Sequence, residues 1–122
     1  MCQHDVDSYS DAEAAISLSP LDPFMYGFYG VRALSYLADC DYDNARLWAN
    51  KAAHQPGALI VMDLIAVAAN DLAGREQAAA HWAARARSRN AQLPPGLLFT
   101  ALPFSPGEFR DRLCSALDRF GL

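Results

Sequence analysis

Two stretches of the chain share a pattern of tryptophan and alanine that decides the fold. Asn44–Ala52 reads NARLWANKA and Ala78–Ala86 reads AAAHWAARA, so the two stretches are 34 residues apart (78 minus 44). At this offset Trp48 aligns with Trp82, which are the two tryptophans of the chain, and three alanines of each stretch also align. Repeats of this length are typical of stacked units, each of which buries the exposed face of its neighbour. The sequence therefore predicts two copies of one structural unit.

Each copy is predicted to be a pair of antiparallel helices joined by a short turn. The turns are Asp39-Cys40-Asp41 in the first copy and Gly74 in the second, and Pro56-Gly57 separates the copies. The expected helices span residues 23–39, 42–54, 58–73 and 75–89. Small side chains let two helices cross closely, which accounts for the recurring alanines. No stretch shows sustained strand-like alternation, so the fold class is predicted to be all-α.

A further helix is predicted at each end of the chain. One apolar face at the N-terminus indicates a helix within residues 5–18; its members are Val6, Tyr9, Ala12 and Ile16. Near the C-terminus, Ser105-Pro106-Gly107-Glu108 is typical of a capping box with proline at the first helical position. The apolar stripe from Phe109 to Phe120 follows it, with charged residues on the other face. This last helix is predicted to close the stack as a cap.

The 34-residue unit resembles the tetratricopeptide repeat, a helix-turn-helix unit with aromatic and small residues at fixed positions. The positions that match its signature are Tyr29, Arg32, Ala33 and Tyr36, then Ala45, Ala49 and Ala52, with Pro56 close by. The string CDYDNA at residues 40–45 is similar to a turn frequent in that family. Among these positions Arg32 departs from the usual leucine and Ala49 replaces the usual aromatic residue. The second copy keeps only the alanines of its second helix. The resemblance implies an antiparallel helix-pair solenoid of about six helices.

A narrower resemblance covers most of the chain. The run from Ile16 to Pro23, ISLSPLDP, and the Leu102-Pro103-Phe104 stretch are similar to the C-terminal tetratricopeptide regions of bacterial regulators. Such regions follow winged-helix DNA-binding domains or class III adenylate cyclase domains. The resemblance implies that this chain is the regulatory tail of a larger protein. We expect one domain over residues 1–122, divided into a half-repeat helix (5–18), two repeats (22–55 and 56–90), a connector (91–104) and a capping helix (105–122).

Composition excludes several classes of protein. The chain has 122 residues, 52% of them hydrophobic and 20% charged, so it can build a core. Its net charge of −4 argues against direct nucleic-acid binding. No apolar run approaches the roughly 20 residues of a membrane span, and Met1–Ser10 has no basic residue of a secretory signal. Three distant cysteines form no disulfide framework, which predicts a cytoplasmic location.

The sequence offers no catalytic constellation. Nucleotide-binding, nucleophile-elbow and zinc-protease motifs are all missing. Cys2 and His4 lack the other two ligands of a structural zinc site. The carboxylates Asp39, Asp41 and Asp43 are interpreted as helix caps and solubilising charge. We therefore predict no enzyme activity, no metal site and no cofactor.

The leading functional hypothesis is a protein-interaction module with a regulatory role. By analogy with the repeat family, the first helix of each pair would line a concave face for an apolar peptide or protein segment. Its expected residues are Gly27, Gly30, Leu34, Leu37, Val61, Leu64, Ala68 and Asp71. The alternative is a small-molecule sensor, in which Arg32 anchors a ligand beside Gly27 and Gly30.

Self-association is also predicted. The N-terminal helix, which carries Val6, Tyr9, Ala12 and Ile16, has no partner helix in the expected repeat pattern. An exposed apolar face of this kind tends to meet another surface. We therefore expect two copies of the chain to pair through this helix, about a two-fold axis.

Overall fold

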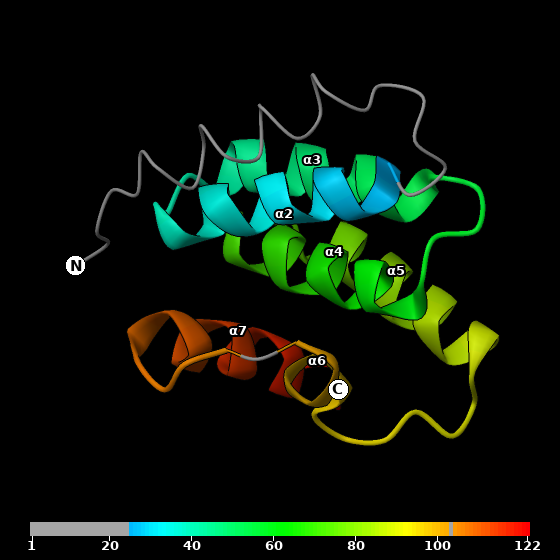
Figure 1. The fold of residues 1–122 in the computed structure, drawn as a ribbon. Helices are drawn as coiled ribbons and strands as arrows, with labels where there is room; N and C mark the ends of the chain where they lie inside the picture. The colour runs from blue at the N-terminus through cyan, green and yellow to red at the C-terminus, as the bar shows by residue number, and fades with distance from the viewer. Residues whose placement is uncertain (1–24, 103) are drawn as a thin grey trace.

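The structure, a computed structural model, describes residues 25–102 and 104–122 (Figure 1). These residues form six α-helices and no strand: α2 (Met25–Ala38), α3 (Tyr42–His54), α4 (Ile60–Leu72), α5 (Glu76–Arg89), α6 (Leu97–Ala101) and α7 (Glu108–Asp118). The prediction of an all-α fold is confirmed for the described residues. Across the same ranges, no helix has both the length and the apolar character that a membrane crossing needs. The predicted helix within 5–18 lies outside them, and so do Val6, Tyr9, Ala12 and Ile16.

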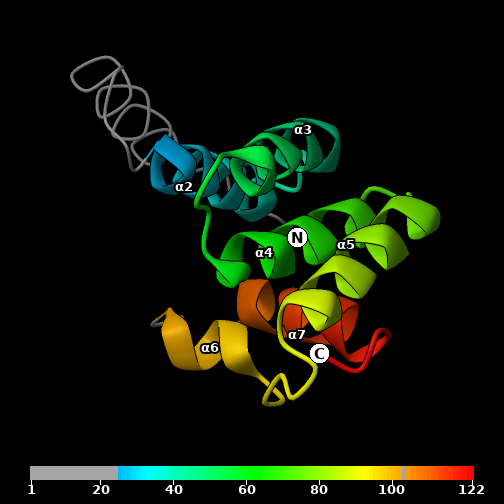
Figure 2. The same ribbon diagram turned by 90° about the vertical axis from the view of Figure 1, so that its right-hand side faces the viewer.

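The helices lie in three layers. Figure 2 shows α2 with α3 at the top, α4 with α5 in the middle, and α6 with α7 below. Figure 1 shows that α2 and α4 run in the same direction, while α3 and α5 return antiparallel to them. Helix α4 packs against α2, α3, α5, α6 and α7, so it is the central helix of the described fold.

The two helix pairs have the same turn, hydrogen bond for hydrogen bond. In the first pair, the Cys40 amide donates to the Leu37 carbonyl (3.1 Å) and the Asp41 amide donates to the Tyr36 carbonyl (2.9 Å). In the second pair, the residues 34 positions later make the same two bonds: Gly74 to Asp71 (3.0 Å) and Arg75 to Asn70 (2.8 Å). This is the Schellman arrangement, in which a left-handed residue ends a helix. Cys40 and Gly74 supply that residue, with φ of 60° and 77°.

Alanine sets the spacing between the paired helices. The three aligned alanines of α3 and the three of α5 are all at most 1% exposed; they are Ala45, Ala49 and Ala52, and Ala79, Ala83 and Ala86. Gly30 acts in the same way between α2 and α4, since a Cβ placed there would lie 2.8 Å from the sulfur of Met62. Side chains of small volume at these positions therefore allow the layers to approach closely.

The C-terminal region differs from the sequence-based expectation in two ways. Helix α6 lies within the stretch that was expected to be a connector. Helix α7 begins at Glu108 with Gly107 as N-cap, and no side chain caps it, so the predicted capping box at Ser105–Glu108 is wrong. The Gly96 amide donates to the Leu122 carbonyl (2.9 Å), which joins the start of α6 to the residue that ends the chain.

Candidate functional site

The residues of α4 that were predicted to line the concave face are buried in this structure. Every residue of α4 from Val61 to Asp71 is buried, including Leu64 (1% exposed) and Ala68 (0%). The lining on α2 is also partly closed, because Gly30 is buried and Leu37 is 0% exposed. Helices α6 and α7 pack directly against α4 and cover it. The predicted lining residues of α4 are therefore buried in this structure, and a partner-binding role for them stays a prediction.

The open part of the lining lies on α2. Gly27 and Leu34 are half-buried, and Val31 is 49% exposed. These positions are separated by four and three residues, so their side chains share one face of the helix. A Cβ placed on Gly27 would meet no atom of the described residues within 4 Å, so none of these residues fills the space beside it. We name this face, formed by Gly27, Val31 and Leu34, the α2 stripe.

Arg32 faces away from the α2 stripe and lies over an aromatic ring. Its guanidinium carbon is 4.3 Å from the centre of the Trp48 ring and 5.9 Å from the centre of the Tyr36 ring. The Nζ of Lys51 lies 5.1 Å from the centre of the same tryptophan. Cation–π contacts of this kind hold the charged groups against the rings. The head group that the sensor hypothesis needs is thus already in contact with Trp48.

The second pair repeats part of this arrangement around Trp82. The guanidinium carbon of Arg85 lies 5.1 Å from the Trp82 ring centre, and Arg85 is the residue that aligns with Lys51. The next turn of α5 carries Arg89, whose Nη1 lies 3.0 Å from Oδ2 of Asp63. Asp63 is 0% exposed, so this ion pair links α5 to the interior of the fold. Sequence reasoning did not single out Asp63, because a carboxylate in an apolar helix gives no sign of its partner.

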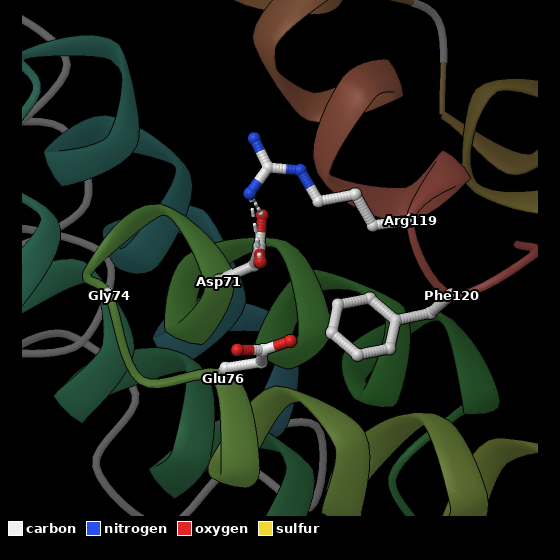
Figure 3. Close-up of a pocket in the computed structure, with 5 residues that line it drawn as sticks. All are labelled: Asp71, Gly74, Glu76, Arg119 and Phe120. Carbon is white, nitrogen blue, oxygen red and sulfur yellow. Dashed lines mark hydrogen bonds and ion pairs between the residues drawn. The ribbon is translucent and has the colours of Figure 1, made fainter.

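A small polar pocket lies where the α4–α5 turn meets the end of α7 (Figure 3). Its volume is about 220 Å³, and it is lined by Asp71, Gly74, Glu76, Arg119 and Phe120. The Nη1 atom of Arg119 lies 3.3 Å from Oδ2 of Asp71 and 3.4 Å from its Oδ1. Of the five lining residues only Asp71 was predicted as a site residue. The others come from segments distant in sequence, whose meeting no local pattern indicates.

Cysteine chemistry differs from the expectation. Cys114 is a free and exposed thiol, while Cys40 is disulfide-bonded. The cysteine-based argument for a reducing compartment therefore no longer holds, and a cytoplasmic location stays a prediction. Across residues 25–102 and 104–122, no group of three or more histidine, cysteine or acidic side chains is arranged to hold a metal ion.

Comparison of the chain with models of protein families, with curated proteins and with solved structures returned no significant match.

Proposed function

We propose that this chain is a non-catalytic protein–protein interaction module built as a tetratricopeptide-like helix-pair solenoid. The observation that carries the proposal is the identity of the two turns. Cys40 and Gly74, 34 residues apart, end their helices with the same pair of backbone hydrogen bonds. Repeated helix pairs that stack in one direction offer extended surfaces to partner chains, and this is the common use of such architectures.

The partner-binding surface that we propose is the α2 stripe. It combines Gly27 and Leu34, which were expected in the lining, with the exposed Val31, which was not. An apolar stripe with four-residue and three-residue spacing fits an apolar segment laid along it. Burying one large apolar side chain in such a contact contributes about 1.5–3 kcal/mol.

The regulatory part of the proposal rests on the sequence resemblance. We propose that the module works as the C-terminal part of a larger bacterial signalling or transcription-regulatory protein, in which the α2 stripe binds a protein or peptide. The small-molecule alternative has less support, because the Arg32 guanidinium lies 4.3 Å from the centre of the Trp48 ring.

A displayed-peptide selection against the immobilised chain tests the proposal. Selected peptides are then titrated by calorimetry against the unmodified chain and the variant Leu34→Lys. The matched control is Leu47→Lys, because Leu47 is 54% exposed on α3 and belongs to another face. We expect Leu34→Lys to weaken binding roughly tenfold, which corresponds to about 1.4 kcal/mol, and Leu47→Lys to leave it unchanged.

Circular dichroism of both variants checks that they fold. The proposal fails if no peptide binds, or if binding responds to Leu47→Lys and is indifferent to Leu34→Lys.

A further inference from the structure

We propose that the pocket formed by Asp71, Glu76 and Phe120 receives the ammonium group of a lysine side chain from the bound partner. This inference rests on the proposed interaction function and adds one specific contact to it. The pocket lies at the α4–α5 turn (Figure 3), outside the α2 stripe. The pocket would therefore bind a part of the partner that the α2 stripe does not contact.

The first argument is the acceptor that the fold leaves in the pocket. The Asp71 side chain is 5% exposed, and no hydrogen bond from the described part of the chain reaches its Oδ2 atom. Arg119 forms an ion pair there through a single nitrogen, at 3.3 Å, which is longer than the 2.7–2.9 Å typical of charge-assisted hydrogen bonds. A carboxylate can accept about four hydrogen bonds in all. Asp71 lines the pocket, and its remaining acceptor capacity lies against the Arg119 side chain in this structure.

The second argument is the mobility available to Arg119. Its side chain is 65% exposed, while the Asp71 side chain that it contacts is almost fully buried. A largely exposed arginine gains little from holding one geometry. It can turn toward solvent when a better donor enters, so a competing cation can reach the buried carboxylate without disturbing the core.

The third argument is the chemistry of the other walls. Figure 3 shows the Glu76 carboxylate and the Phe120 ring facing the same space as Asp71. Two carboxylates against one guanidinium leave a net negative charge, which disfavours an anion. An ammonium group carries three donors, enough for both carboxylates, and its methylene stem can lie on the ring. A pocket of about 220 Å³ is smaller than the roughly 300–1,000 Å³ of sites for drug-sized ligands.

The small number of oxygen ligands in the pocket also favours a lysine over a metal ion. Calcium takes about six to eight oxygen ligands, and this pocket offers only two carboxylates beside a competing arginine. A single ion pair with a solvent-exposed partner contributes little binding free energy on its own. Such a contact is useful as one element of a larger interface, which is the reason to assign the ammonium group to a partner protein.

The test uses the full chain labelled with ¹⁵N and the probe N-acetyl-lysine amide. We expect saturable shifts of the backbone amides of Gly74, Glu76 and Phe120, and no such shifts with N-acetyl-norleucine amide, which has a similar stem without the charge. The variant Glu76→Gln should bind the probe roughly threefold more weakly. The matched control is Asp43→Asn, because Asp43 is an exposed acid in the first turn of α3 and should leave binding unchanged.

Three results would overturn the inference. They are the absence of saturable shifts at these amides, equal binding of the norleucine probe, and the same shifts with magnesium chloride at matched ionic strength. The first two deny a lysine site, and the third indicates a general cation site. If peptides selected against the chain still depend on Leu34, the interaction function stands while the lysine pocket fails. If lysine amide binds but no peptide does, the interaction function fails independently.

Discussion

A single residue in the left-handed region ends the first helix of each pair. Cys40 (φ 60°) and Gly74 (φ 77°) occupy this position. Glycine adopts such a conformation without steric cost, while other residues lose about 1–2 kcal/mol because Cβ approaches the following carbonyl. The second turn thus has glycine, which adopts a positive φ freely. The first turn has Cys40, whose side chain disfavours a positive φ.

We predict that Gly74→Ala lowers the free energy of unfolding by about 1 kcal/mol. A Cβ at this position would meet no atom of residues 25–102 or 104–122 within 4 Å, so the loss comes from the backbone and not from a clash with them. The control is Gly27→Ala, which also has open space but lies inside α2. Alanine there should raise stability by roughly 0.5–1 kcal/mol. Urea denaturation measures both values; a stabilised Gly74→Ala would show that φ at this turn is not constrained.

At the scale of elements, α4 holds its neighbours through polar side chains as well as apolar ones. Asp63 pairs with Arg89 of α5, and Asp71 pairs with Arg119 just beyond α7. Asn70 donates to the side chain of Asn50 in α3 at 2.8 Å. Each polar group thus selects a different neighbour, which favours one arrangement of the helices over others that would bury the same apolar area.

Arg89 makes the strongest of these links, because its Nη2 also donates to the carbonyl of Ala58 at 2.6 Å. We predict that Arg89→Met destabilises the fold by about 3 kcal/mol, since it leaves the buried Asp63 carboxylate poorly paired. Arg85→Met should cost less than about 1 kcal/mol, because Arg85 Nε lies 3.9 Å from Oδ1 of Asp63, against 3.0 Å for the Arg89 contact.

The double variant Asp63→Leu, Arg89→Met tests the cause. We expect it to recover much of the lost stability, because it removes the unpaired buried charge. Chemical denaturation of the three variants measures this, and equal losses for Arg85→Met and Arg89→Met would contradict the assignment.

At the scale of the molecule, sequence patterns predicted the helix bounds that depend on neighbouring residues, such as caps and turns. The bounds of α3 match the expectation, since Asp41 accepts a hydrogen bond from the Asn44 amide as an N-cap and Pro56-Gly57 follows the helix. A capping helix within residues 105–122 was predicted, but its contacts with α4 were not, because they join segments distant in the sequence. Arg112 of α7, for example, donates to the carbonyl of Leu37, 75 residues away. No local periodicity indicates that such a contact forms, so the closure of the expected lining was missed.

Because α4 contacts every other described helix, we predict that the two helix pairs unfold together. Each pair carries one tryptophan, Trp48 in α3 and Trp82 in α5, so each can report separately. In Trp82→Phe the fluorescence follows the first pair, and in Trp48→Phe it follows the second. Within each variant, the urea midpoint from fluorescence should coincide with that from far-ultraviolet circular dichroism, as two-state unfolding requires.

The variants also separate cooperative unfolding from unfolding pair by pair. A repeat array with weak interfaces would lose its end unit first, since stability in such arrays is a sum of units and contacts between neighbours. That behaviour would appear as a Trp48 transition at lower urea than the loss of helicity. The burial of α4 from Val61 to Asp71 argues for the opposite outcome, because the first pair cannot separate from the second without exposing α4 to water.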